Sequence, residues 1–134
     1  MADTQSQPSR QAPQRGFWYL ATPYSRHPGG VDAAHKEACE AAAICFRAGI
    51  QVFSPIAHAH AIAMVGQMDG HFGQWATFDR IMIGMSAGMI VVEMDGFSTS
   101  VGIAAEIALA ESLGKPVVFM TPGIAPAVPI EMGK

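Results

Sequence analysis

The sequence predicts a single α/β domain built on a parallel sheet. Half of the 134 residues are hydrophobic, which is enough for one core and leaves little room for a second domain. Four short apolar runs alternate with longer helix-forming segments, and no hairpin signal joins any two runs. Strands connected through helices pair in parallel and are covered by helices on both faces. The pattern therefore predicts a three-layer, flavodoxin- or Rossmann-like sheet of four to five strands.

Turn-forming residues bound most of these segments. The predicted strands are residues 17–21, 51–53, 89–93 and 116–120. The predicted helices are residues 31–48, 57–65, 74–85 and 101–113, with loops at 28–30 and 66–73. Residues 1–16 are almost free of apolar side chains and are expected to form a disordered lead-in. The domain then spans residues 17–134, and its last part, residues 122–134, holds three prolines and is expected to be irregular.

Composition excludes several classes of function. The formal net charge is −3, and no basic stripe is present, so a nucleic acid polymer is not an expected partner. The longest apolar stretch, residues 81–92, is too short and too interrupted by glycine to span a membrane. Cys39 and Cys45 are six residues apart and do not form a metal-binding pair. With no secretory signal in residues 1–16, we expect a cytoplasmic protein.

The loop after the third predicted strand carries the strongest functional signal. In parallel sheets, ligands bind beyond the carboxyl ends of the strands. Here three hydroxyl residues, Ser98, Thr99 and Ser100, precede a helix and serve either as a cap or as an anion cradle. Gly102 lets a ligand approach the backbone. Glu106 has only Ala and Ile as near neighbours, so it is either solvated on the outer face or has a task.

Several segments together resemble one known family. They are Tyr19 to Ser25, Ser54-Pro55, Asp79, and the strand–turn–helix sequence VVEMDGFSTSVGIAAEIALAESLGKPVVF. In order and spacing they are similar to the nucleoside 2-deoxyribosyltransferase superfamily, which includes the deoxynucleoside 5′-monophosphate N-glycosidases. Within it, the chain is most similar to a bacterial and phage branch. The resemblance covers residues 17 to about 121.

The resemblance implies a set of catalytic residues and no cofactor. Glu106 matches the family carboxylate that attacks the anomeric carbon and forms a covalent glycosyl-enzyme. Tyr19 matches the tyrosine that orients this carboxylate. Asp79 matches the acid that assists departure of the base. The family also implies a homodimer or a larger homo-oligomer.

Ser100 bears on the choice of substrate. Transferases that act on free nucleosides tend to carry an acid at this position, whereas the monophosphate hydrolases carry a serine. A hydroxyl at a helix N-terminus accepts a phosphate that a carboxylate would repel. The resemblance therefore implies hydrolysis of a (deoxy)nucleoside 5′-monophosphate, with Ser98 and Gly102 completing the phosphate cradle. A transferase that moves deoxyribose between bases, and a nucleotide sensor without catalysis, remain alternatives.

The loop after the first strand departs from the hydrolase pattern because it is longer. Its candidate substrate-binding residues are Thr22, Tyr24 and Arg26. We expect Tyr24 to stack on the base and Arg26 to pair with the phosphate.

Two histidines follow Ser54-Pro55. On an extended strand, His58 and His60 would lie on one side, a spacing used for metals, whereas on a helix they would diverge. No further ligand motif supports a metal, so none is predicted, and a metal hydrolase is the remaining alternative. We expect both rings to line the base pocket, with a structural role as the alternative. Trp75 either stacks on the base or belongs to the core.

Overall fold

The computed structural model describes residues 16–68 and 72–129. Four strands form one parallel sheet in the order β2-β1-β3-β4. They are β1 (Trp18–Ala21), β2 (Val52–Phe53), β3 (Gly88–Val92) and β4 (Val117–Met120). The two central strands, β1 and β3, are buried along their whole length, as their unbroken apolar sequences require. The predicted parallel sheet is confirmed, with four strands.

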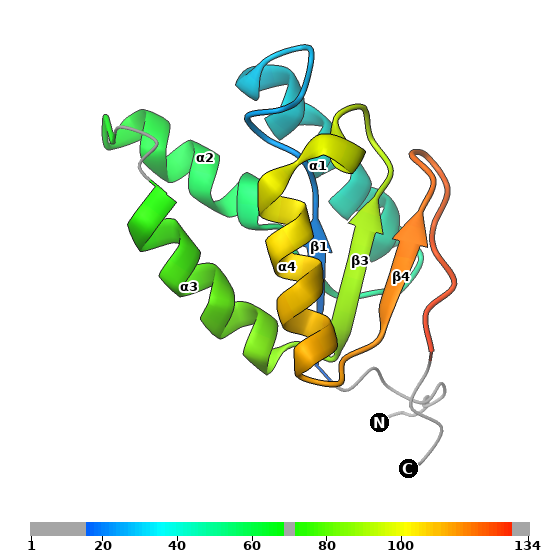
Figure 1. Ribbon diagram of the computed structural model, residues 1–134. Helices are drawn as coiled ribbons and strands as arrows, with labels where there is room; N and C mark the ends of the chain where they lie inside the picture. Colours follow the sequence, from blue (N-terminus) through cyan, green and yellow to red (C-terminus); the bar gives the residue numbers. More distant parts are fainter. Residues whose placement is uncertain (1–15, 69–71, 130–134) are drawn as a thin grey trace, which may run out of the picture.

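Helices cover both faces of the sheet (Figure 1). They are α1 (Val31–Arg47), α2 (Pro55–Val65), α3 (Phe72–Met85) and α4 (Val101–Ser112), with a short 3-10 turn, η2 (Phe97–Thr99), before α4. On one face α1 packs Ala41 and Cys45 against Trp18 and Leu20. On the other face, residues of α3 and α4 pack around Tyr19. The three-layer prediction is therefore confirmed. No described helix is long and apolar enough to cross a membrane.

Two helices begin earlier than the sequence analysis predicts. The predicted start of α2 at Ala57 is wrong by two residues, because Ser54 Oγ accepts the Ala57 N–H at 3.1 Å and Pro55 occupies the first turn. Helix α3 starts at Phe72, so the predicted loop 66–73 is too long at its end. Residues 121–129 contain no helix or strand, as predicted. The lead-in up to residue 15 and the last residues, 130–134, lie outside the described part.

The contact between β1 and β3 leaves no room for a side chain at Gly88. Gly88 pairs with Trp18, and a Cβ there would lie 2.3 Å from the indole ring, which is only 2% exposed. We therefore expect Gly88→Ala to lower the free energy of unfolding by about 1–3 kcal/mol, measured by urea denaturation. The control is Gly84→Ala on α3, where a Cβ meets nothing within 4 Å. Equal stability of the two variants would contradict this packing argument.

Candidate functional site

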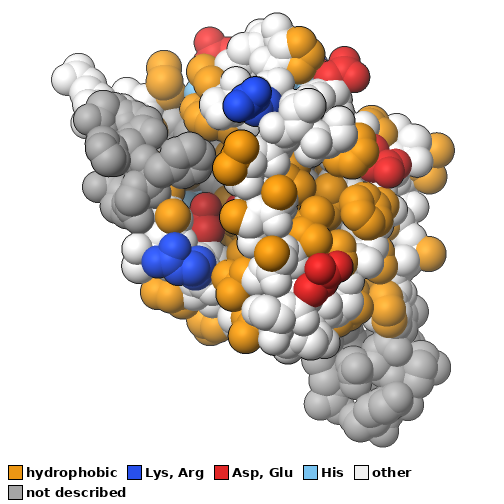
Figure 2. Space-filling view, viewed as in Figure 1, with side chains coloured by type: hydrophobic (Ala, Val, Ile, Leu, Met, Phe, Trp, Pro, Cys, Tyr) orange, Lys and Arg blue, Asp and Glu red, His pale blue; other side chains and the backbone are white. Residues whose placement is uncertain are grey.

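A cavity of about 360 Å³ opens between α3 and α4, beside the loop that follows β1. We call it the α3–α4 cavity. Its walls are formed by Ala76, Asp79, Arg80 and Ile83 of α3, Val101, Gly102, Ala105, Glu106 and Leu109 of α4, and Ser25 and Arg26 of the loop. The space-filling view shows recessed acidic atoms on this face, with separate groups of basic atoms above and below them (Figure 2). Acidic side chains thus form part of an otherwise largely apolar cavity.

Glu106 is held in this cavity by a hydrogen bond from the sheet. Helix α4 buries Ile103 and Ala110 against the sheet, and Glu106 lies between them in sequence, partly buried. The hydroxyl of Tyr19, a fully buried residue of β1, donates to Glu106 Oε2 at 2.7 Å. Burial raises the pKa of Glu106 to about 7; the Tyr19 hydrogen bond lowers it, and the charge of Asp79 adds to the rise.

Asp79 supplies a second carboxyl group from the opposite wall. Burial raises its pKa to about 6, and hydrogen bonding with Tyr19 opposes this rise. The pKa of Tyr19 is raised well above its usual value, first by burial and then by the two carboxylates, so the hydroxyl keeps its proton. Two carboxyl groups that both ionise near neutral pH share one proton over part of this range. Such a pair has the composition needed for a nucleophile and an acid.

The N-terminal end of α4 forms the second part of the cavity. Ser100 Oγ accepts the Ile103 N–H at 3.1 Å, so Ser100 acts as the helix cap, and it does not line the cavity. The N–H groups of Val101 and Gly102 have no partner within the helix, and both residues line the cavity beside Arg26. Ser98 is exposed on η2 and lies outside the cavity walls.

Gly96 explains why Arg26 lies near the start of α4. Its φ of 95° is in the left-handed region, and a Cβ there would lie 2.5 Å from the backbone oxygen of Arg26. The loop after β1 therefore packs directly on the loop after β3. The Asp95-Gly96 pair indicates a turn in the sequence, but its contact with a loop 70 residues earlier cannot be read from it.

The structure places Tyr24 and His60 away from the α3–α4 cavity. Tyr24 Oη and His60 Nδ1 are 2.8 Å apart, and His60 Nε2 lies 3.2 Å from Asp32 Oδ1. The His60 ring also stacks on His35, with centroids 4.4 Å apart. These contacts tie the loop after β1 to α1 and α2. Thr22 is also outside the cavity walls; its buried hydroxyl has no hydrogen-bond partner among the described residues.

His58 and His60 both lie on helix α2, so their rings diverge, and His58 has different partners from His60. Its ring stacks on Phe78 with centroids 5.3 Å apart and meets Trp75 edge-on at 6.3 Å. Phe53 lies between this group and Tyr19, 5.9 Å from the tyrosine ring. These four aromatic residues therefore form a wall beside Tyr19. In residues 16–68 and 72–129, no group of three or more His, Cys, Asp or Glu could hold a metal ion. His71 lies outside the described residues.

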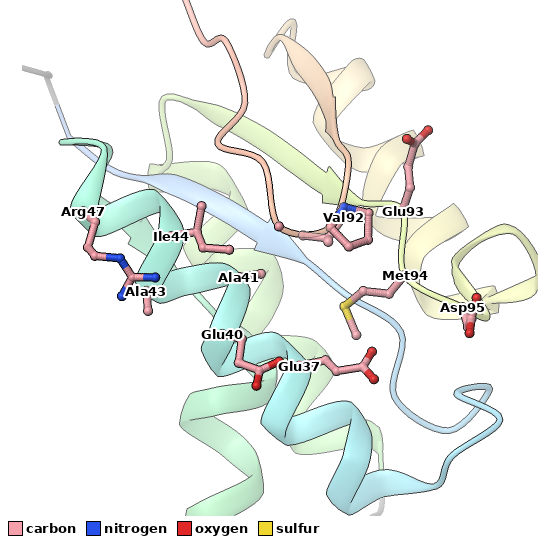
Figure 3. A pocket seen from close by; sticks show the side chains of 12 residues that line it. Glu37, Glu40, Ala41, Ala43, Ile44, Arg47, Val92, Glu93, Met94 and Asp95 are labelled. Carbon is pink, nitrogen blue, oxygen red and sulfur yellow. The ribbon is translucent and has the colours of Figure 1, made fainter.

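A second, larger cavity of about 640 Å³ lies between α1 and the ends of β3 and β4. Figure 3 shows Glu37, Glu40 and Arg47 on α1 and Met94 across from them. Four carboxylates line this cavity with a single arginine, so a phosphate would be repelled there. The α3–α4 cavity, with two carboxylates and two arginines, is less hostile to an anion.

One family model matches the chain. It is described as "Domain of unknown function (DUF1937)" and matches residues 16–122. The chain belongs to this family. The DUF1937 match spans all four strands and all four helices, and therefore includes Tyr19, Asp79 and Glu106. Among curated proteins, none matches the chain.

Among the polar residues that line the cavity, sequence reasoning missed Ser25 and Arg80. Ser25 lies next to the expected Arg26, and Arg80 directly follows Asp79. Position beside an expected site residue is the signal that would have found them.

Proposed function

We propose that the chain hydrolyses the N-glycosidic bond of a (deoxy)nucleoside 5′-monophosphate and releases the free base through a covalent intermediate on Glu106. The observation that carries the proposal is the partly buried Glu106 carboxylate, held by Tyr19 at 2.7 Å on the wall of a cavity that also contains Asp79. A carboxylate pair on an apolar wall suits a transition state with positive charge on the sugar. The resemblance of the sequence to the nucleoside 2-deoxyribosyltransferase superfamily supports the same reaction.

The first step forms the bond between the anomeric carbon and Glu106. As the glycosidic C–N bond breaks, its electron pair moves to the base nitrogen, and the proton on Asp79 goes to the base. In the second step Asp79, now ionised, takes a proton from water. The water oxygen bonds to the anomeric carbon, and the electron pair of the ester bond returns to Glu106. The products are the free base and the sugar 5′-phosphate.

These two reaction steps require one proton on the carboxyl pair, and that proton must be on Asp79. The Tyr19 hydroxyl donates to Glu106 and so stabilises the ionised form of that group. With pKa values of about 6 and about 7 in the pair, the singly protonated state is populated close to neutral pH. Because the pKa of Glu106 is the higher of the two, the proton is more often on Glu106. The Tyr19 hydrogen bond to Glu106 increases the share of the reactive arrangement, in which Glu106 is ionised and Asp79 carries the proton.

The other end of the cavity supports a phosphate on the substrate. Arg26 forms no ion pair with an acidic side chain of the described residues, and it lines the same cavity as Val101 and Gly102, the first residues of α4. Along α4, Gly102 and Glu106 are four residues apart, which is about 6 Å at 1.5 Å per residue. A ribose ring separates its 5′-phosphate from the anomeric carbon by a comparable distance. The spacing therefore suits a nucleotide with its phosphate at Arg26.

The test is chromatographic detection of free base. Purified protein is incubated with ribo- and deoxyribonucleosides and with their 5′-monophosphates, in the presence and absence of a second base. Release from monophosphates without an added base is the expected result. Release only when a second base is present would make the protein a transferase. Binding without release from any compound would contradict the proposal and favour a nucleotide sensor.

Removal of the Tyr19 hydroxyl tests the link between the sheet and the nucleophile. Since its hydrogen bond lowers the pKa of Glu106, Tyr19→Phe should raise that pKa and move the acid limb of the kcat/KM profile to higher pH. We expect roughly a 10-fold loss of kcat/KM at pH 6 and a smaller loss at pH 8. Tyr24→Phe is the control, because Tyr24 bonds to His60, and it should leave the limb in place. An unmoved limb in Tyr19→Phe would contradict this role.

A further inference from the structure

The α3–α4 cavity contains a second cation, Arg80, that the proposed reaction does not yet use. Arg80 lines the cavity from α3 and directly follows Asp79. It is exposed, and within the described part of the chain no acidic side chain pairs with it. Basic atoms lie on both sides of the recessed acidic atoms in Figure 2. A charged guanidinium without an acidic partner at a cavity wall is available to a ligand.

We propose that Arg80 binds the leaving base and favours bases that carry a carbonyl oxygen next to the glycosidic nitrogen, that is, the pyrimidines. This inference rests on the proposed N-glycosidase function. It assigns a specificity role to a residue that follows the catalytic acid, and it narrows the substrate class from nucleotides in general to pyrimidine nucleotides.

The position of Arg80 on α3 separates it from the phosphate end of the cavity. Consecutive helical residues are about 1.5 Å apart along the axis and about 100° apart around it, so Arg80 lies at the level of Asp79 and lines the cavity from the next position around α3. Asp79 is the group that protonates the departing base in the proposed mechanism. The phosphate end already has Arg26 and the free N–H groups of α4. In the proposed mechanism Arg80 is therefore the cation at the level of the leaving group, whereas Arg26 is at the phosphate.

The apolar residues of both walls suit a flat ring. Helix α4 contributes Ala105 and Leu109 to this cavity, and α3 contributes Ala76 and Ile83. These side chains offer apolar surface to the faces of a base but no hydrogen bond to its edge. Recognition of the edge is thus left to Asp79 and Arg80.

The charge that develops on the leaving base explains the preference for pyrimidines. When the C–N bond of a pyrimidine nucleotide breaks, negative charge spreads from the ring nitrogen to the adjacent carbonyl oxygen. A guanidinium donates N–H groups in a fixed planar fork and keeps its charge at any working pH. Its bond to that oxygen therefore strengthens as the charge develops. Purines have no carbonyl oxygen next to the glycosidic nitrogen, so Arg80 should assist their release less.

The test compares Arg80→Gln with the wild type on deoxyuridine, deoxycytidine, deoxyadenosine and deoxyguanosine 5′-monophosphates. We expect kcat/KM to fall about 10- to 100-fold for the two pyrimidines and by less than about 3-fold for the purines. With 5-fluorodeoxyuridine 5′-monophosphate the loss should shrink, because the fluorinated base is a better leaving group. Arg80→Lys should recover part of the lost activity, since it restores the charge without the fork.

Arg26→Gln is the matched control, because it removes a guanidinium from the phosphate end of the same cavity. It should reduce cleavage of all monophosphates alike and leave free nucleosides unaffected. Equal losses for all bases in Arg80→Gln, or no loss, would overturn the inference. If Arg80→Gln lowered kcat/KM for all monophosphates but not for free nucleosides, Arg80 would be a second phosphate ligand. Failure of the wild type to release any base would contradict the proposed function itself, and it is seen before any variant is compared.

Discussion

Glu106→Gln is expected to lower kcat for base release by at least about 10⁴-fold, because the variant has no group that can bond to the anomeric carbon. The amide oxygen of glutamine can still accept the Tyr19 hydrogen bond that now measures 2.7 Å. The cavity should therefore keep its shape and its affinity for nucleotide. The measurements are chromatographic kcat and nucleotide binding by calorimetry.

The same substitution should raise stability at alkaline pH. The folded protein holds the Glu106 proton up to a pKa of about 7, whereas the unfolded chain releases it near 4.5. Folding is therefore favoured by this group at low pH, and the contribution is lost as pH rises from about 4.5 through about 7. Glutamine cannot ionise and avoids this loss. We expect Glu106→Gln to be more stable than the wild type by up to about 3 kcal/mol at pH 8, and by nearly nothing at pH 4.5.

Glu111→Gln is the control for both measurements, since Glu111 lies exposed on the same helix. It should change neither turnover nor the dependence of stability on pH. A Glu106→Gln variant that kept wild-type turnover would contradict the mechanism. A variant that lost turnover without gaining stability at pH 8 would instead contradict the burial of the ionised carboxylate.

The loss of turnover and the gain in stability expected for Glu106→Gln have the same physical cause. An ionised carboxylate in a partly apolar wall costs free energy, and a single hydroxyl, that of Tyr19, offsets only part of that cost. The cost makes the Glu106 carboxylate more reactive toward an electrophilic carbon than a solvated carboxylate would be. Catalytic sites commonly reduce stability in this way.

The fold could be predicted from local patterns to a large extent. The apolar run before Thr22-Pro23 and the continuous run around Ile90 identify the two central strands, because both of their faces are buried. Helix α1 begins at Val31 as predicted, since glycines precede it and alanines fill it. The first residues of α2 and α3 were harder to predict from the sequence. Ser54 directly follows the predicted strand 51–53, and only the folded chain shows that its hydroxyl caps the helix.

The site was less predictable because its contacts join distant parts of the chain. Tyr19 and Glu106 are 87 residues apart, and their roles came from a resemblance to a family, not from composition or periodicity. Ser100 illustrates the limit of local reading: the sequence left capping and anion binding open, and the structure shows the cap. Tyr24 and His60, both expected at the ligand, bond to each other instead.

Replacement of Asp79 with asparagine should have the second largest effect. Without a proton donor, the base must depart as an anion, so we expect kcat for natural bases to fall by about 10²- to 10⁴-fold. A substrate whose leaving group needs no proton, such as 4-nitrophenyl 2-deoxyribose 5-phosphate, should release nitrophenolate at close to the wild-type rate in the first turnover, because only the second step then lacks its base. Asp95→Asn, at the other cavity, is the matched control and should affect neither substrate.

The pH profile of Asp79→Asn distinguishes an acid from a residue that only shapes the cavity. In the wild type, activity should fall on the alkaline side as the carboxyl pair loses its last proton, near pH 7. Asparagine cannot titrate, so this limb should vanish. On the acid limb of the proposed mechanism Asp79 carries its proton, so the substitution removes no charge there and this limb should stay in place, unlike the shift expected for Tyr19→Phe. A uniform loss for both substrates, with both limbs in place, would show that Asp79 does not transfer the proton.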